Sequence, residues 1–226
     1  MEPFLSNISI KVNEHTYIKN PDSTELGKKI ITGSIDFIEQ NGVEEFNFKK
    51  LAQEINSTEA SIYRYFENKY KLLLYLSSWY WAWLDSKLIL NTINVDDPVD
   101  QLNRAIQSVT ESVTEDSKIS HINEVKLQKI IYVEAPKAIF NQTAIEEHKQ
   151  EYFATYKQVI ERICEFILKI NPNFSYPHML ISTVIEGAHY QRFLNDNLPS
   201  FTDHSKSDDA ITTFYKNMVQ STLKIN

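Results

Sequence analysis

Residues 58–66 carry polar side chains at a spacing that could make hydrogen bonds to one flat target. Ile62 and Phe66 are four residues apart, so a helix here would turn both toward the interior. The opposite side would face solvent with Glu59, Ser61, Arg64 and Tyr65. Hydroxyl and guanidinium groups at such positions can hydrogen-bond to the edges of nucleic-acid bases.

A second short amphipathic segment precedes this one and must position it. Its apolar residues recur at i, i+3, i+4 and i+7, which places them on one helical face: Phe48, Leu51, Ala52 and Ile55. Asn47 can cap that helix because its side-chain oxygen can accept from a first-turn N–H group. The polar joint at residues 56–58 ends the first helix, and Ser57 or Thr58 can cap the next.

Two helices of about two turns each, joined by so few residues, must cross steeply. This layout fits a helix-turn-helix, whose second helix is free to lie in the major groove of DNA. It fits an ordinary helical hairpin as well, because short amphipathic helix pairs are common. The residue pattern alone leaves both interpretations open.

The run from Ser61 to Lys69, SIYRYFENK, followed by Leu72, resembles the recognition helix and following turn of the TetR (tetracycline-repressor) family of bacterial transcription regulators. The resemblance covers roughly residues 24–72 and includes an earlier helix and Leu51-Ala52. The matching residues of that earlier helix are Ile30, Ile31, Gly33, Ser34, Phe37, Ile38 and Gly42.

This resemblance implies an all-α protein that regulates transcription, and a repressor is expected rather than an activator. Residues 1–23 would form an arm, 24–70 the helix-turn-helix domain, and 71–226 a ligand-binding and dimerisation bundle. Three partners are expected: operator DNA, a second copy of the chain and a small-molecule effector. The operator would be palindromic and bound by a dimer. The expected DNA-binding residues are Asn47, Lys49, Thr58, Ser61, Tyr63, Arg64, Tyr65 and Lys69.

Two departures from the family pattern fall in the turn. Ile55-Asn56-Ser57 stands where the family usually has Ala-Gly-Val. Asn tolerates the left-handed conformation that Gly would supply, so the turn can be kept. Glu59 stands where a Lys is common, which bears on DNA affinity rather than on the fold.

The last two expected helices, about residues 177–195 and 208–223, each carry an apolar stripe. In the family the corresponding helices pair with their symmetry mates into a four-helix bundle. The interface expected on this basis consists of Leu180, Val184, Ala188, Gln191, Ile211, Tyr215 and Met218. The stripes could instead simply close the core of the monomer.

An effector pocket is expected in the C-terminal bundle, beside a long helix that begins near residue 69 and meets no breaker until Asn91. Its expected lining is Trp79, Tyr80, Trp83, His121, Tyr132, His148, Tyr152 and Tyr156. Aromatic walls with few basic groups suit an apolar, aromatic or cationic ligand. The same rings could equally fill a core.

Composition narrows the class of protein further. The 226 residues are 42% hydrophobic and 23% charged, which is ordinary globular material. Four glycines and seven prolines argue against an all-β fold with many tight turns. The single cysteine, Cys164, has apolar neighbours and is expected to be a buried structural thiol. No run is apolar and long enough to span a bilayer, so a cytoplasmic protein without membrane contact is expected.

The net charge of −7 argues against general binding to nucleic acids. Residues 24–90 contain eight basic and nine acidic side chains, so even the expected DNA-binding domain is nearly neutral. Specific binding would then depend on dimerisation and on a local cluster of cations. That cluster is Lys49, Lys50, Arg64, Lys69 and Lys71.

The remaining chain is expected to be helical after residue 20. Alternating residues near Ile8–Val12 and a run at 15–19 suggest a small hairpin or an extended arm before it. Further helices are expected at about 24–40, from Asp97-Pro98 onward, at 120–133, and from 136 toward 169.

No phosphate-binding loop, nucleophile motif or paired-cysteine site occurs, so neither enzymatic activity nor a cofactor is expected. Glu186 and His189 have a spacing seen in metal sites of helical bundles, and Glu147-His148 is a second pair. Neither pair has further ligands, and no metal is expected. The alternative function is a helical interaction or small-molecule-binding protein whose DNA-binding module has decayed.

Overall fold

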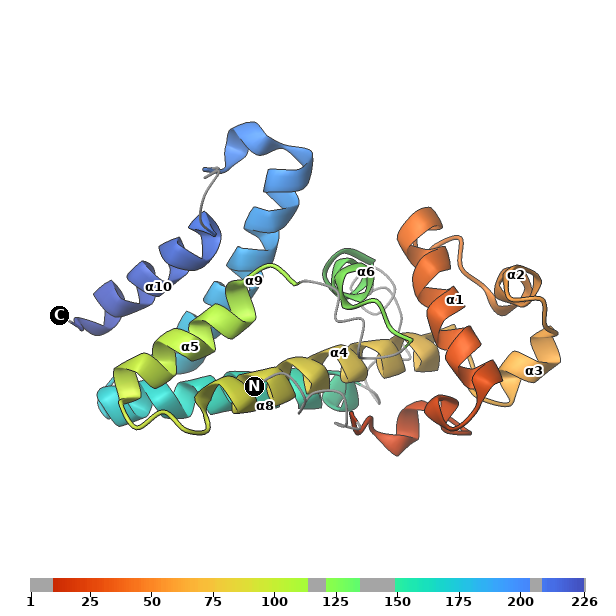
Figure 1. The fold of residues 1–226 in the computed structure, drawn as a ribbon, viewed down its shortest axis with the longest axis horizontal. Coiled ribbons are helices and arrows are strands. Elements are labelled where there is room, and N and C mark those ends of the chain that lie inside the picture. The colour runs from red at the N-terminus through yellow and green to blue at the C-terminus, as the bar shows by residue number, and fades with distance from the viewer. Residues whose placement is uncertain (1–9, 114–120, 135–148, 204–208, 226) are drawn as a thin grey trace. The chain divides into compact units, whose positions relative to one another are not determined.

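The computed structural model describes residues 10–113, 121–134, 149–203 and 209–225; the side chains of 134 and 149–152 are not included. These residues form helices and no strand, so the all-α prediction is confirmed (Figure 1). The chain divides into two compact units. Unit 1 comprises residues 1–83 and 113–155, and unit 2 comprises 84–112 and 156–226.

The first described part of unit 1 is a pair of 3-10 turns, η2 (Glu14–Thr16) and η3 (Pro21–Ser23). The extended run predicted at residues 15–19 is therefore wrong, and residues 1–9 lie outside the described part. The side chains of Asn13 and Asn20 explain the difference, because each accepts a hydrogen bond from a backbone N–H two residues later. Such local bonds favour turns over strands.

Helix α1 (Glu25–Asn41) begins and ends as its sequence predicts. The Thr24 hydroxyl caps it by accepting from the N–H of Gly27 at 3.0 Å. Gly42 ends it with a φ of 80°, a conformation that favours glycine. The buried face of α1 includes Ile30, Ile31, Ser34, Ile35 and Ile38.

Three more helices of unit 1 follow directly: α2 (Phe48–Glu54), α3 (Glu59–Tyr63) and α4 (Lys69–Thr92). The aromatic residues of α4 point around its circumference. Tyr75, Trp79, Tyr80, Trp81 and Trp83 are buried and Tyr70 is half-buried, so the predicted covering on several sides is confirmed. Helix α4 is continuous and contributes residues up to Trp83 to unit 1 and residues from Leu84 to unit 2. One helix therefore contributes residues to both units.

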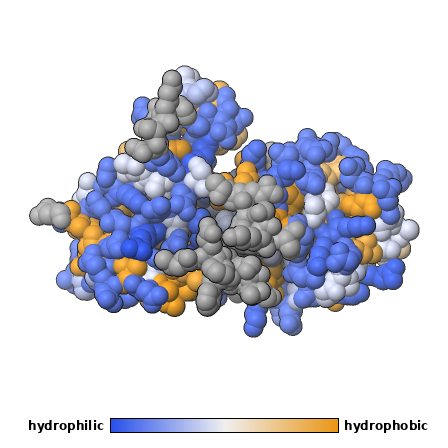
Figure 2. Space-filling view, viewed as in Figure 1, coloured by the Kyte–Doolittle hydropathy of each residue, from blue (hydrophilic) through white to orange (hydrophobic). Residues whose placement is uncertain are grey.

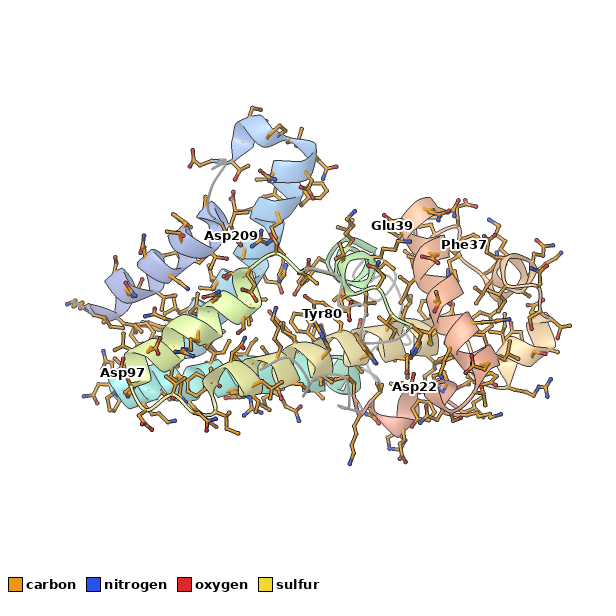
Figure 3. All side chains as sticks on the ribbon, in the orientation of Figure 1. Asp22, Phe37, Glu39, Tyr80, Asp97 and Asp209 are labelled. Atoms are coloured by element: carbon orange, nitrogen blue, oxygen red, sulfur yellow. The ribbon has the colours of Figure 1, made fainter. Side chains whose placement is uncertain are left out.

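Helix α6 (Glu124–Lys129) and a π-helical turn, Ile130–Glu134, account for most of the helix predicted at 120–133. Helix α6 packs against α1 and holds it with two ion pairs. Lys126 Nζ lies 2.6 Å from Asp36 Oδ1, and Lys129 Nζ lies 3.7 Å from Glu39 Oε1. Figure 3 labels Glu39 on the side of α1 near α6.

Unit 2 is a helical bundle built from α5 (Pro98–Thr110), α9 (Pro177–Asn197) and α10 (Ala210–Leu223), with part of α8 (Lys149–Ile170). A 3-10 turn, η6 (Pro199–Phe201), follows α9. Helices α9 and α10 approach closely at Gly187, where a Cβ would lie 2.2 Å from the Tyr215 hydroxyl. Cys164 is buried as predicted, and burial raises the pKa of its thiol to about 12. The predicted helix at residues 136–148 lies outside the described part.

Arg192 joins three helices of unit 2. Its guanidinium donates to the Ser112 hydroxyl at 2.8 Å, to the Thr110 carbonyl, and to Asp209 Oδ2 at 2.7 Å. Asp209 caps α10 by accepting from the N–H of Thr212 at 3.1 Å (Figure 3). Burial alone would raise the pKa of Asp209, but the hydrogen bonds from Arg192 and Thr212 outweigh it and hold that pKa below its usual value. None of the described helices combines the length and apolar character that crossing a bilayer requires.

We expect Asp209→Asn to lower the free energy of unfolding by about 1–2 kcal/mol at pH 7. A carboxylate whose pKa is depressed on folding stabilises the protein above the unfolded pKa of about 4, and that contribution is lost as the pH falls through the folded pKa. The difference between the two proteins in urea titrations should therefore shrink below about pH 4. Asp203→Asn, at an exposed position, is the control and should match the wild type throughout. A difference that does not change with pH would contradict this role.

Candidate nucleic-acid interface

Helices α2 and α3 are joined by a turn that depends on one left-handed residue. Asn56 has a φ of 52°, as predicted for the residue that replaces glycine. The Ser57 N–H then donates to the carbonyl of Ala52 at 2.8 Å and closes the turn. Asn47 caps α2 as predicted, because its side chain accepts from the Lys50 N–H at 2.9 Å.

The turn is packed against α1. A Cβ on Gly33 would lie 2.4 Å from Cγ2 of Ile55, so glycine at this position leaves room for the Ile55 side chain against α1. Ile62 and Phe66 are fully buried, and they hold α3 against this support. Helices α1, α2 and α3 therefore form a small core that presents one side of α3 to solvent.

That side of α3 carries a connected row of polar groups. Thr58 caps the helix, and its hydroxyl lies 2.8 Å from the Ser61 hydroxyl. The Ser61 hydroxyl in turn accepts from Nη2 of Arg64 at 3.2 Å. Thr58 and Arg64 are exposed and Ser61 is half-buried. Hydroxyl and guanidinium groups in one row are suited to base edges in a groove.

Tyr63 serves two purposes in this arrangement. Its ring packs edge-on against Phe48, with 5.0 Å between the ring centroids, which ties α3 to α2. It is nevertheless 47% exposed, so part of the residue remains on the surface. Both the packing role and the predicted contact role therefore remain compatible with its position.

Tyr65 does not face solvent, and this prediction is wrong. Its side chain is only 4% exposed, and its hydroxyl lies 2.7 Å from the Thr24 hydroxyl. The chain leaves α3 after Tyr63, so the helical spacing used to place Tyr65 no longer applies there. The carbonyl of Tyr65 also accepts from the Ile18 N–H at 2.8 Å. Tyr65 is thus a core residue next to the polar row.

The predicted cations differ in how far they are engaged within the domain. Lys49 is exposed, whereas Lys50 pairs with Glu45 and lowers the pKa of that carboxyl by a hydrogen bond. Lys69 is the first residue of α4, as predicted. Lys71 donates to the carbonyl of His15 at 3.0 Å. Lys49 and Lys69 are thus the members of the predicted cluster best placed to meet phosphates, while Arg64 belongs to the polar row of α3.

A comparison of sequences independently identifies most of residues 24–76. A family profile described as "Bacterial regulatory proteins, tetR family" matches residues 30–76, which contain most of α1, all of α2 and α3, and the start of α4. This part of the chain is a TetR-family DNA-binding domain. The resemblance inferred from the recognition-helix residues is therefore confirmed.

Solved structures match over most of the chain. The fatty acid degradation regulator FadR from Bacillus halodurans has 16% identity and a TM-score of 0.59 over 86% of this chain and 93% of its own. The superantigen PfiT has 9% identity and a TM-score of 0.60 over 90% and 97%. AibR in complex with isovaleryl coenzyme A and operator DNA has 13% identity and a TM-score of 0.54 over 86% and 97%. Identities this low show a shared fold and nothing further. No curated protein sequence matches the chain.

Three of the predicted effector-binding aromatics lie together with a fourth from another helix. Trp79, Tyr80 and Trp83 are buried on α4 within unit 1. The ring of Tyr132, from the π-helical turn, packs edge-on against Tyr80 with 5.9 Å between centroids. Gln128 donates to the Tyr80 hydroxyl at 3.2 Å, a polar contact that sequence analysis did not identify.

The other predicted effector residues lie elsewhere. His121 contacts Asp22, with 3.0 Å between Nε2 and Oδ1, and its carbonyl accepts from the Thr32 hydroxyl at 2.6 Å. Tyr156 belongs to unit 2, where its hydroxyl donates to Glu186 at 2.8 Å. His148 and the side chain of Tyr152 lie outside the described residues.

Two serines of α4 were missed because nothing in a local pattern marks them. Ser77 and Ser78 are buried beside the aromatic residues of unit 1. Their hydroxyls have no hydrogen-bond partner among the residues that the structure describes. A buried hydroxyl without a partner is costly, so these two groups are candidates for contact with a polar atom of a bound molecule.

The predicted dimer residues are divided between core and surface. Val184, Ala188 and Tyr215 are buried within unit 2, which accounts for part of both stripes. Leu180, Gln191, Ile211 and Met218 are half-buried. Large apolar side chains remain exposed on these two helices, and the rings of Tyr190 and Phe193 stack on each other. They are Met179 (67%), Tyr190 (60%) and Phe193 (40%) on α9 and Phe214 (58%) on α10.

The pair Glu186 and His189 does not form a metal site in the described structure. Glu186 is exposed, whereas His189 is buried, and burial followed by the charge of Arg192 lowers the pKa of its imidazole well below the usual value. No group of three or more potential ligands for a metal occurs among the described residues.

We expect Arg64→Ala and Lys69→Ala to affect DNA binding in different ways. Loss of a base contact by Arg64 should cost about 1–3 kcal/mol on the preferred sequence and reduce discrimination between sequences. Loss of a phosphate contact by Lys69 should weaken binding to all sequences alike. It should also reduce the slope of log affinity against log salt concentration by about one. Fluorescence anisotropy on preferred and scrambled duplexes separates the two effects.

Lys157→Ala, an exposed lysine of α8, is the matched control and should leave both affinities unchanged. Unchanged affinity in the Arg64→Ala, Lys69→Ala double variant would show that DNA binds elsewhere.

Proposed function

We propose that this protein is a ligand-responsive regulator of transcription that binds a palindromic operator as a homodimer and acts as a repressor. The observation that carries this proposal is the polar row of Thr58, Ser61 and Arg64 on α3. The helix-turn-helix that presents this row lies in the part of the chain that the family profile matches. Thr58 also caps α3, but the guanidinium of Arg64 is exposed and is not needed for that cap. A role in binding explains why these side chains are kept at the surface.

The dimer part of the proposal is supported by charge and by exposed apolar area. A nearly neutral DNA-binding domain gains few contacts with phosphates, so a second copy is needed to double them. Figure 2 shows that hydrophilic residues cover most of the visible face, with hydrophobic residues gathered in places. Tyr190, Phe193 and Phe214 are exposed large apolar residues on α9 and α10, and clustered exposure of this kind marks interaction surfaces. The predicted half-buried residues of these helices would line the same interface.

The alternative is an interaction or small-molecule-binding protein with a decayed DNA-binding module. The fold alone does not exclude it, since the superantigen PfiT has a similar structure. The acidic net charge of −7 is compatible with it. The intact turn at Asn56 and the capped α2 and α3 favour a functioning module, because decay would not preserve these local bonds. DNA selection separates the two functions.

We expect selection from a random duplex library to enrich an inverted repeat. A two-fold dimer presents two recognition helices in equivalent ways, so its half-sites must be related by the same symmetry. Light scattering should give about twice the 26.4 kDa mass of one chain. Enrichment of no sequence would support the alternative function. A 26.4 kDa particle at micromolar concentration would rule out the dimer.

The effector part of the proposal rests on the aromatic cluster of unit 1. Tyr80 and Tyr132 pack edge-on, and the buried hydroxyls of Ser77 and Ser78 offer polar partners beside them. An apolar or aromatic molecule with one or two hydrogen-bonding groups suits such a lining. AibR has been solved with isovaleryl coenzyme A, an apolar acyl group on a polar carrier, so acyl thioesters are reasonable first probes. A cytoplasmic location follows from the proposed access to DNA.

Binding can affect DNA because α4 runs from the aromatic cluster to the turn after α3. A ligand that favours the non-binding state by only about 1–3 kcal/mol changes operator affinity by roughly 5- to 150-fold. All three tryptophans of the chain, at positions 79, 81 and 83, lie on this helix.

We expect any compound that releases operator DNA to change tryptophan fluorescence over the same concentration range. The test titrates isovaleryl coenzyme A, free coenzyme A and a panel of small aromatic compounds. Trp83→Phe should weaken that compound's binding by several-fold while leaving DNA affinity in its absence intact. A compound that quenches the tryptophans at saturation yet leaves operator affinity unchanged would contradict the coupling through α4.

A further inference from the structure

The segment that precedes α1, residues 13–24, converges on the residue that follows the recognition helix. We call it the N-terminal segment. The Ile18 N–H donates to the carbonyl of Tyr65 at 2.8 Å, and the Thr24 and Tyr65 hydroxyls lie 2.7 Å apart. Lys19 Nζ lies 5.2 Å from the centroid of the Tyr65 ring. Three residues of one segment thus hold Tyr65, one through its backbone and two through its buried side chain.

Tyr65 is coupled directly to the polar row of α3. Its N–H donates to the carbonyl of Ile62 at 2.8 Å and closes the last turn of that helix. The preceding residue is Arg64, whose guanidinium is exposed and bonded to Ser61. A displacement of Tyr65 must therefore displace Arg64, because the two share a peptide bond.

The N-terminal segment is itself closely packed and can act as a fixed support. A Cβ on Gly27 would lie 2.1 Å from the carbonyl oxygen of Pro21, so α1 and the segment meet backbone to backbone. The Asn20 side chain caps the turn by accepting from the Asp22 N–H at 2.9 Å. The Tyr17 ring packs edge-on against Tyr75 of α4, with 6.0 Å between centroids.

Asp22 joins this segment to the rest of unit 1. Its Oδ2 accepts from the Tyr75 hydroxyl at 3.0 Å, and its Oδ1 lies 3.0 Å from Nε2 of His121, three residues before α6. Burial alone would raise the pKa of Asp22, but His121 and Tyr75 outweigh it and hold that pKa below its usual value. One carboxylate thereby contacts both α4 and the approach to α6. Figure 3 labels Asp22 on the turn that precedes α1.

We propose that the N-terminal segment positions the recognition helix for base contacts by holding Tyr65, and that Asp22 ties the segment to α4 and to the residues before α6. This proposal rests on the DNA-binding function proposed above. Tyr65, Thr24 and Asp22 are positioning residues in it, and none of them needs to touch DNA.

The test compares affinity for the selected operator with affinity for a scrambled duplex, using the full-length chain. Tyr65→Phe removes only the hydroxyl bonded to Thr24, and Asp22→Asn removes the charge that faces His121. Each should lower the ratio of specific to non-specific affinity by about three- to tenfold, since each removes about one hydrogen bond that fixes the helix. A merely structural loss would reduce the folded fraction and lower both affinities equally. Circular dichroism identifies a temperature at which every variant is fully folded.

Two further variants sharpen the comparison. Thr24→Ser keeps the hydroxyl that caps α1 and contacts Tyr65, so it should keep the ratio of the wild type. Thr110→Val removes a buried hydroxyl of unit 2, which donates to the Ile106 carbonyl at 2.7 Å, without changing side-chain size. It should lower stability and leave the ratio unchanged.

The outcomes separate this proposal from the proposed function. A wild-type chain that prefers no sequence would overturn the DNA-binding function itself. A wild-type preference that Tyr65→Phe and Asp22→Asn both retain would overturn only the role of the N-terminal segment. A ratio lowered as much by Thr110→Val as by Tyr65→Phe would also overturn it, because the effect would then follow stability rather than position.

Discussion

Helix α3 is too short to be stable or correctly placed by its own backbone bonds. It spans only Glu59–Tyr63, and isolated helices shorter than about 12 residues are marginal in water. Its orientation is therefore set by what it buries, Ile62 and then Phe66, and by the contacts of the residue that follows it. Every proposed base contact depends on this constraint, because side chains that read DNA must be held in register with the groove.

Three elements meet that requirement from different directions. Helix α2 contributes Phe48, whose ring packs edge-on against Tyr63 of α3, and α1 contributes the close approach at Gly33. The N-terminal segment contributes the contacts to Tyr65. Two of these supports, α1 and the segment, are in turn held by the region of α6, through Lys126 and His121. The orientation of α3 is thus sensitive to the part of unit 1 that also contains the aromatic cluster.

The charge of the chain makes such positioning more important than it would be in a basic protein. Many cations give a DNA-binding protein affinity for any sequence, and small errors of geometry are then tolerated. Here Lys50 pairs with Glu45 and Lys71 is bonded to a backbone carbonyl, so few cations remain for phosphates. Affinity for the operator must then come from correctly placed base contacts and, in the proposed dimer, from a second DNA-binding domain. Precise support of α3 and dimerisation serve the same end.

Local signals in the sequence correctly determined the fold class, the two ends of α1 and several capping residues. Asn47, Thr58 and Asp97 all cap the helices predicted from them, and Asn56 takes the left-handed conformation predicted for the turn. These predictions succeeded because each depends on a hydrogen bond or a backbone angle within a few residues. The family-like run from Ser61 to Lys69 is local in the same sense.

Only the tertiary structure decided which side chains are buried by residues distant in the sequence. Tyr65 was predicted to face solvent, yet Ile18 and Thr24, more than 40 residues away in sequence, enclose it. Val184 and Ala188 lie on an apolar stripe that could have faced a second chain, and packing within unit 2 buries them instead. Asp22 and His121 are too distant in sequence for any pattern to relate them. Helical periodicity fixes which residues share a face, but only long-range packing determines what that face contacts.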